Sequence, residues 1–325
     1  MNTNKNKVAA CVTDNCFEDA DNPIEAFYQK TYGAAFLGDS MELIKRVKTS
    51  SVNLVITSPP FALTRKKEYG NKSAEEYVEW FLPFAEEFKR VLKDDGSFVL
   101  DLGSAYLPGV PVKSIYQYEL LVRLCKETGF FLAQDFFHYN PARLPAPAEW
   151  VNIRRIRVKD SVNVVWWLSK TEFPKADNYK VLKPYSESMI ALLKNGYKAK
   201  LRPSGHDISP NFQKNNNGSI PPNLLEIANT ESNSKYLKRC REAKTKPHPA
   251  RYPEEFARFF IDFLTDEGDV VLDPFAGSNT TGFVSETLKR KWISFEINED
   301  YLLGSIYRFE LVNDLFASMA RGVKT

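Results

Sequence analysis

Cysteine and histidine are scarce in this chain, which has only four cysteines and three histidines in 325 residues. The cysteines are scattered, and no two of them form a CxxC pair. A zinc site built from such a pair and further cysteines or histidines is therefore not indicated. Without clustered cysteines a disulfide framework is not indicated either. The sequence therefore predicts free thiols and no metal.

Long apolar runs are also missing. No stretch approaches the roughly 18 apolar residues of a membrane span, and the first residues, MNTNKNKVAACVTDNCFEDADNP, contain no apolar signal-peptide core. The pattern GxGxxG is absent, which disfavours a nicotinamide or flavin enzyme. We expect a globular cytoplasmic protein with no membrane partner, in which the 43% apolar residues fill a large core.

Charge of one sign is not in large excess, because the net charge is only +3. The net charge alone therefore does not indicate a nucleic-acid partner, and the evidence for one depends on where the basic residues lie. They gather in three segments of the middle of the chain, and a solvated basic surface fits any single segment about as well as a phosphate-binding one. The segments contain Arg154, Arg155, Arg157 and Lys159; Lys194, Lys198, Lys200 and Arg202; and Lys235, Lys238, Arg239, Arg241, Lys244 and Lys246.

Strand and helix patterns alternate on both flanks of the chain, which predicts a mostly parallel, doubly wound sheet. Between Asn140 and about His248 this alternation breaks, because the segment is rich in proline, turns and polar residues around one strand at 161–172. We expect this middle part to be a small recognition region. Strands are expected at 33–39, 52–57, 96–103, 130–139, 269–273 and 292–298, and helices at 41–50, 74–92, 114–129, 253–268, 283–291 and 299–320.

The strand VNLVIT runs directly into Ser58, Pro59, Pro60 and Phe61. Two consecutive prolines remove two backbone donors and fix φ, which is an unusual end for a buried strand. The result is a rigid corner with a hydroxyl before it, a free carbonyl within it and an aromatic ring after it. A proline corner beside a core aromatic is the structural alternative.

A second corner lies in DVVLDPFAGSNTTG, where a buried strand ends at Asp273 and turns through Gly277 into a helix. Glycine allows a ligand to approach the backbone closely, and a helix N-terminus offers N–H donors. The next strand ends in Glu296, where a carboxylate can accept from ribose hydroxyls. Alone, each feature also fits an ordinary turn or a surface carboxylate.

TSPPF followed by DPFAGSNTTG and SFE, in this order, resembles the cytosine-N4 DNA methyltransferases of the permuted β group. The resemblance runs from about Gly33 to about Arg308. It implies a class I α/β methyltransferase fold, with a circularly permuted, mostly parallel seven-stranded sheet and a small target-recognition region. It also implies methyl transfer from S-adenosyl-L-methionine to N4 of a cytosine flipped out of a specific double-stranded DNA site.

The same resemblance suggests the organisation and partners of the chain. We expect an N-terminal extension over 1–32, a catalytic half over 33–172, a target-recognition region over 173–247 and a cofactor-binding half over 248–325. Pairing with a restriction endonuclease and a monomeric or weakly dimeric state are further expectations.

The family's catalytic motif falls on Ser58, Pro59, Pro60 and Phe61. In this interpretation the Ser58 hydroxyl and the Pro59 carbonyl accept the two hydrogens of the amino group, and Phe61 stacks on the flipped base. Asp101 ends the neighbouring strand, where it is expected either to orient Ser58 and help remove the proton or to be a structural carboxylate.

The resemblance also assigns the cofactor contacts. Asp39 matches the position that holds the adenine amino group, Asp273 and the Gly277 turn match the methionine contacts, and the segment 248–253, HPARYP, matches a further cofactor motif. A plain loop-to-helix connection is the alternative for HPARYP. The expected cofactor residues are Asp39, His248, Arg251, Asp273, Phe275, Gly277, Ser278, Asn279, Thr280 and Glu296.

For DNA contacts we expect basic groups on phosphates and polar groups on base edges. Asn223 or Asn229 is a further base-reading candidate. The expected DNA-binding residues are Arg154, Arg155, Arg202, Ser204, His206, Lys235 and Lys238.

Two other functions compete with cytosine-N4 methylation. Adenine-N6 enzymes resemble this family but usually carry Asp or Asn where Ser58 stands and Tyr where Phe61 stands. A DNA-binding module that retains the cofactor only as a ligand would have no need of the intact SPPF corner. Cytosine-C5 methylation is excluded, since none of the four cysteines follows a proline.

Overall fold

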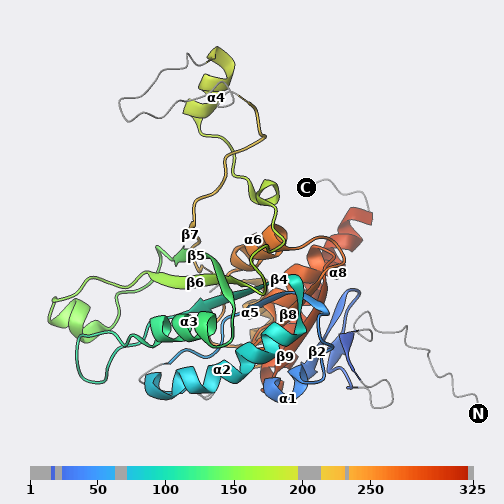
Figure 1. Ribbon diagram of the computed structural model, residues 1–325. Coiled ribbons are helices and arrows are strands. Elements are labelled where there is room, and N and C mark those ends of the chain that lie inside the picture. Colours follow the sequence, from blue (N-terminus) through green and yellow to red (C-terminus); the bar gives the residue numbers. More distant parts are fainter. Residues whose placement is uncertain (1–15, 19–23, 63–71, 197–213, 231–233, 321–325) are drawn as a thin grey trace, which may run out of the picture.

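The computed structural model describes residues 16–18, 24–62, 72–196, 214–230 and 234–320. Their strands form one sheet in the order β1-β2-β9-β8-β3-β4-β6-β5-β7 (Figure 1). The strands are β1 (Tyr28–Gln29), β2 (Gly33–Leu37), β3 (Val52–Thr57), β4 (Leu92–Leu102), β5 (Phe131–Tyr139), β6 (Val162–Ser169), β7 (Leu224–Glu226), β8 (Val270–Asp273) and β9 (Lys291–Glu296).

The centre of the sheet is parallel, because β2, β9, β8, β3 and β4 all pair in that sense. β6 is antiparallel to both of its neighbours, β4 and β5. These seven strands confirm the expected mostly parallel sheet. Two short edge strands, β1 and β7, enlarge it to nine, and segments of two or three residues are too short to show a strand periodicity in the sequence.

Helices cover both faces of the sheet, and the central strand β3 is therefore buried on both sides. Val55 packs into one cluster with α1 (Ser40–Ile44), α2 (Ala74–Val91) and α3 (Tyr116–Lys126). Its neighbours Leu54 and Ile56 pack on the other face with α6 (Glu254–Leu264) and α7 (Thr280–Thr287). α8 (Glu299–Ala320) covers β2 and β9 on the α7 side. Within the described chain, every helix is too short or too polar to span a bilayer.

The middle region is partly built into this fold. β7 pairs with β5, and α5 (Lys235–Glu242) packs against α8. Earlier in the chain, α4 (Glu187–Asn195) buries no side chain and stands well away from the sheet (Figure 1). Two short turns, η2 (Glu149–Ile153) and η3 (Asn178–Val181), lie in the connections on either side of β6. The expected region 173–247 is therefore anchored to the sheet by β7, and its boundaries stay a prediction.

The pairing of β3 with β8 brings the two sequence motifs together. Leu54 lies opposite Val271, and Val55 lies opposite Leu272. Because these parallel strands end at the same edge of the sheet, the corner after β3 and the glycine turn after β8 are neighbours although about 200 residues separate them.

Candidate functional site

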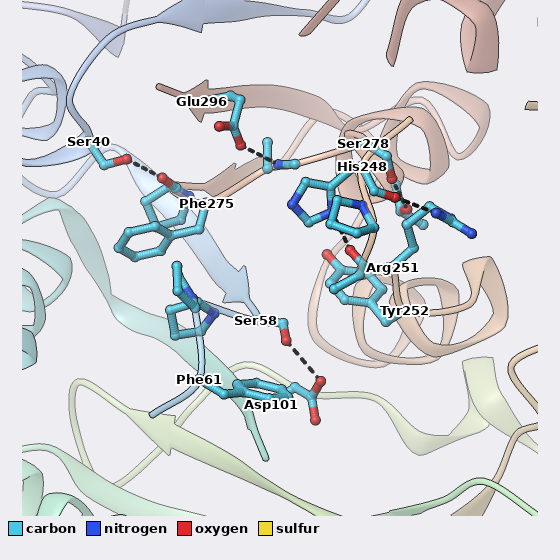
Figure 2. Close-up of a pocket in the computed structure, with 18 of the residues that line it drawn as sticks. Ser40, Ser58, Phe61, Asp101, His248, Arg251, Tyr252, Phe275, Ser278 and Glu296 are labelled. Carbon is cyan, nitrogen blue, oxygen red and sulfur yellow. Dashed lines mark hydrogen bonds between the residues drawn. The ribbon is translucent and has the colours of Figure 1, made fainter. Parts of the chain in front are cut away.

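A cavity of about 570 Å³ opens at the carboxyl ends of the parallel strands. Volumes of about 300–1,000 Å³ are typical of small-molecule sites. Figure 2 shows Glu296 and Phe275 on one side of it and Ser58 and Asp101 on the other. The lining includes Asp39, Ser58, Pro59, Pro60, Phe61, Asp101, His248, Arg251, Phe275, Gly277, Ser278, Thr280 and Glu296. Most of the side chains expected in a site are thus brought together.

At one end, Ser58 Oγ donates a hydrogen bond to Asp101 Oδ2 over 3.0 Å. Asn163, at the start of β6, donates from Nδ2 to Asp101 Oδ1 over 3.2 Å. An ionised carboxylate only accepts hydrogen bonds, so the single Ser58 proton is held by Asp101. The lone pairs of Ser58 Oγ are then left to accept from another donor.

Asp101 is buried, and burial raises the pKa of its carboxyl above the ordinary value. His138, the hydrogen bonds from Ser58 and Asn163, and Arg143 act in the opposite direction on that pKa. A buried carboxyl with raised proton affinity, bonded to a hydroxyl in a cavity, can receive a proton through that hydroxyl.

The ring of Phe61 rests against Gly103, just after β4. A methyl group at Gly103 would lie 2.4 Å from Phe61 Cδ2, so only glycine leaves room for this ring. The ring also lines the cavity. Its position offers an aromatic surface onto which a planar ligand can stack.

At the other end, the turn after β8 is held from two sides. Gly277 has φ +53, and its N–H donates to Glu296 Oε2 over 2.8 Å. The buried Arg308 of α8 donates from Nε to the Ser278 carbonyl over 2.9 Å and from Nη2 to Ser278 Oγ over 3.1 Å. The turn is therefore rigid, with its backbone facing the cavity.

The half-buried His248 ring lies directly beside this turn. A methyl group at Gly277 would be 3.1 Å from His248 Nδ1 and Cε1. Burial lowers the pKa of His248 to about 4, so the ring is neutral at pH 7. It packs edge-on against Tyr301, with 4.5 Å between ring centroids. A neutral packing role fits this environment better than an ionic one.

Acidic and aromatic groups shape the remaining wall. The carboxylate of Glu296 accepts the N–H groups of Gly277 and Asn298, and burial raises its pKa. Asp39 caps α1 by accepting from Met41 N over 2.8 Å with Oδ1. Phe275 packs against Phe84, with ring centroids 5.2 Å apart. This end of the cavity suits a ligand with hydroxyl or amino donors and a flat ring.

Two of the expected cofactor residues, Asp273 and Asn279, do not line the cavity. Both are buried beneath the turn. Asn279 accepts from Gly282 N over 3.0 Å and from Ser294 Oγ over 2.7 Å, and it donates to Tyr28 over 2.8 Å. The structure thus provides no support for direct contacts by these two residues, and their place is in the support of the turn.

Asp273 receives four internal donors, which we call the Asp273 cluster: Thr57, Tyr252, Thr281 and the N–H of Phe275. The Thr57 hydroxyl lies 2.8 Å from Oδ1 and the Tyr252 hydroxyl 3.1 Å from Oδ2. Because Thr57 precedes Ser58 and Phe275 lies two residues after Asp273, the cluster fixes the corner after β3 relative to the glycine turn.

We expect Thr57→Val to lower the free energy of unfolding by about 1.5–3 kcal/mol, because it removes one hydrogen bond to a buried charged acceptor. Urea unfolding measures this loss. Thr171→Val is the matched control, since the Thr171 hydroxyl donates to the backbone carbonyl of Asp94 at the surface. If the two substitutions lowered the free energy of unfolding equally, the bond to Asp273 would contribute no more than a surface hydrogen bond, which would contradict the prediction.

Four of the expected DNA-binding residues belong to the described part of the chain, and these four lie outside the cavity wall. Arg154 pairs with Glu149 over 2.7 Å and lies over the Trp150 ring. Arg155 follows in the same loop with φ +54, and Lys235 and Lys238 lie on α5. Asn223 Nδ2 donates to the Asp135 carbonyl at the edge of the sheet, whereas Asn229 lines the cavity. Arg202, Ser204 and His206 lie outside the described residues.

Sequence reasoning missed several cavity residues. His138 is the last residue but one of β5, and Asn163 is the second residue of the antiparallel β6, so both reach the same edge as the parallel strand ends. A rule that counts only the ends of strands overlooks Asn163, because an antiparallel strand brings its first residues to this edge. Tyr252 lies within the quoted HPARYP segment and was not singled out. The other missed residues include Ser40, Trp80, Phe84, Asn140 and Arg143.

Comparisons with known proteins agree with this geometry. A family model described as DNA methylase matches residues 52–306. The type II methyltransferase M.PvuII of Proteus hauseri is 52% identical over 305 residues, which are 91% of each chain. The type II methyltransferase M.BglII of Bacillus subtilis is 26% identical over 294 residues, 88% of this chain and 71% of that relative.

Among solved structures, one described as PvuII DNA methyltransferase (cytosine-N4-specific) superimposes with a TM-score of 0.72. The two chains are 46% identical over 92% of this chain and 96% of the other. The similarity therefore extends through the sheet and both motifs that line the cavity.

Proposed function

The chain belongs to the DNA methylase family, and on that premise we propose that it methylates N4 of cytosine in duplex DNA with S-adenosyl-L-methionine as methyl donor. The observation that carries the proposal is that the Ser58–Asp101 pair and the Gly277 turn line one cavity. The 52% identity to M.PvuII, and the structural likeness to a cytosine-N4-specific enzyme, support cytosine as the base.

The amino group of cytosine is a weak nucleophile, because its lone pair is delocalised into the ring. To attack a methyl group the nitrogen must become more tetrahedral, and acceptors that hold both hydrogens stabilise that state more than the flat base. Ser58 Oγ has lone pairs available, because its own hydrogen points to Asp101 in the hydrogen bond between them. The Pro59 carbonyl is the second acceptor, and Phe61 on Gly103 supports the ring.

The proton released from N4 has a short route. Ser58 Oγ receives it while passing its own proton to Asp101 Oδ2, 3.0 Å away. Asn163 holds the other carboxylate oxygen and keeps Asp101 in place. The result is a neutral methylated amine and a protonated Asp101, which returns its proton to solvent after product release.

The donor supplies a methyl group on a sulfonium, which an amine attacks directly. The residues at the Gly277 end fit such a ligand. Gly277 has no Cβ to block the approach to its backbone, and Glu296 presents a carboxylate to ribose hydroxyls. Asp39 and the ring of Phe275 border the space for an adenine. The buried acidic groups at both ends also favour a cationic ligand.

We expect Gly277→Ala to weaken S-adenosyl-L-methionine binding about tenfold or more. The new methyl group would lie 3.1 Å from the His248 ring, and a φ of +53 costs a non-glycine residue roughly 1–2 kcal/mol, so the turn must shift. Isothermal titration calorimetry measures the change. Gly268→Ala has a similar φ cost but meets no atom within 4 Å, and its binding constant should equal that of the parent.

The function is tested by incubating the protein with duplex DNA and labelled S-adenosyl-L-methionine, and then identifying the modified nucleoside. N4-methylcytosine is the expected product. N6-methyladenine would contradict the choice of base. Tight DNA binding without any transfer would instead favour a binding module.

The recognition sequence and the partners are further proposals. The region 173–247 reads the site in this interpretation, because α4 buries no side chain and projects from the sheet as a contact surface (Figure 1). Sequencing DNA modified in cells that express the protein identifies the site. Pairing with a restriction endonuclease, a monomeric or weakly dimeric state and a cytoplasmic location stay predictions.

A further inference from the structure

The base-facing end of the cavity contains an arginine that the proposed mechanism does not use. Arg143 lies in the loop after β5, is half-buried and lines the cavity. In the part of the chain that the structure describes, no hydrogen-bond or ion-pair partner is found for its guanidinium. A guanidinium only donates hydrogen bonds, so this side chain is available to an acceptor on a ligand in the cavity.

Most of the other polar atoms of this end are already engaged. Asp101 accepts from Ser58 and Asn163. His138 Nε2 lies 3.1 Å from the Ile227 carbonyl. Asn140 Oδ1 accepts from the backbone of Ala142 and Asn229, and Asn229 Nδ2 donates to the Arg251 carbonyl over 2.7 Å. Two sets of donors on this wall have no acceptor among the described residues, the Asn140 amide and the N–H groups of Arg143. Of these, only the guanidinium of Arg143 is charged.

The backbone of Arg143 is held firmly. Its N–H donates to the Asn140 carbonyl over 3.1 Å, and its own carbonyl accepts from Lys159 Nζ over 3.2 Å. The guanidinium is close enough to Asp101 to lower the pKa of that carboxyl. Because Arg143 and Asp101 line the same cavity, the guanidinium borders the space for the target base from a loop whose main chain is fixed.

The chemistry of the base indicates what this donor meets. In cytosine, N4, N3 and O2 follow one another along one edge, so anchoring N4 at Ser58 directs two adjacent acceptors toward the neighbouring wall. A guanidinium presents parallel N–H groups that match two adjacent acceptors, which an ammonium does not. The corresponding edge of adenine has N1 followed by a C–H group and offers only one acceptor.

We propose that Arg143 is a specificity-determining residue that donates to N3 and O2 of the flipped cytosine, an inference that rests on the proposed function. These bonds form with the flat base as well as with the transition state. Loss of Arg143 therefore acts mainly on binding of the flipped base and on the preference for cytosine over adenine.

The test uses the full-length protein and a duplex whose target cytosine has been located by sequencing modified DNA. For Arg143→Met we expect kcat/KM on this duplex to fall about 10- to 100-fold, in line with loss of bonds between a charged donor and a buried acceptor. The cytosine-to-adenine ratio at the target position should fall as well. Arg143→Lys should stay close to Arg143→Met, because a point charge does not replace the paired donors.

Modified duplexes identify the acceptor. The base 3-deazacytosine lacks N3, so the parent should lose activity on a duplex that carries it at the target. Arg143→Met should lose little further activity on that duplex, since Arg143 and N3 belong to one contact. Independent losses would overturn the proposal. Full recovery of kcat/KM by Arg143→Lys would also overturn it, because a lysine can replace an arginine on a phosphate. The same holds if the difference in kcat/KM between parent and Arg143→Met disappears with a methylphosphonate beside the target but persists with 3-deazacytosine, since that result indicates a phosphate contact.

Two controls separate this proposal from folding effects and from the proposed function. Arg258→Met removes an exposed charge on α6, and its kcat/KM should equal that of the parent. S-adenosyl-L-methionine binding by Arg143→Met should be unchanged, which shows that the fold is intact. If the parent forms N4-methylcytosine and Arg143→Met does so equally well, only the role of Arg143 fails. If the parent forms none, the proposed function itself fails.

Discussion

Replacing Asp101 by asparagine is expected to lower kcat by about 10²–10⁴-fold, the range typical of a lost general base. The carboxylate accepts the Ser58 proton over 3.0 Å, and among the residues that the structure describes no other acidic group is bonded to that hydroxyl. An amide keeps the size of the side chain but has almost no affinity for a proton. Single-turnover methyl transfer measures the chemical step directly.

The same substitution should leave the protein at least as stable as the parent at pH 7. Burial raises the pKa of Asp101, so the folded state binds its proton more tightly than the unfolded state does. Stability therefore falls as the pH rises from the ordinary pKa through the raised one, because the folded parent must then bury an ionised carboxylate. A neutral amide removes that cost, and urea unfolding measures the difference.

Activity should follow the opposite pH trend. Since the proton route requires ionised Asp101, kcat should fall as the pH drops through its raised pKa, at a higher pH than for an exposed aspartate. Asp135→Asn, on the exposed part of β5, should change neither activity nor stability measurably. If Asp101→Asn kept a third or more of the parent's kcat, the proton route would be wrong.

The sequence predicted where the site lies because strand ends can be read from hydrophobic patterns. Each of the residues Ser58, Asp101, Gly277 and Glu296 was placed at or just after the end of an expected strand. Because parallel strands end at one edge of the sheet, these four residues meet there. The corner after β3 was already recognisable from its two prolines.

The sequence did not reveal which polar groups at that edge face inward. Asp273 and Glu296 both end strands, but Asp273 is occupied by internal donors whereas Glu296 borders the cavity. That difference depends on Thr57 and Tyr252, which come from distant parts of the chain. His138, Arg143 and Asn163 were missed because the reversed direction of β6 and the course of a proline-rich loop leave no periodic signal.

We expect Ser58→Ala to lower kcat by about 10²–10³-fold, as for loss of one of two groups that stabilise a developing charge. The hydroxyl is expected to act twice, as an acceptor for an amino hydrogen and as the link to Asp101. Both interactions strengthen only as N4 becomes tetrahedral. Binding constants for DNA and for S-adenosyl-L-methionine should therefore remain close to those of the parent.

The contrast with a serine at the other end of the same segment makes this prediction specific. Ser51 precedes β3 and donates to the Lys48 carbonyl over 2.7 Å, away from the cavity. Ser51→Ala removes the same hydroxyl from the same part of the fold, and its kcat should equal that of the parent. If Ser58→Ala reduced kcat no more than Ser51→Ala, the amino group would have to be held by the Pro59 carbonyl alone. The choice of cytosine over adenine would then depend on Arg143 and Phe61 rather than on the hydroxyl at the corner.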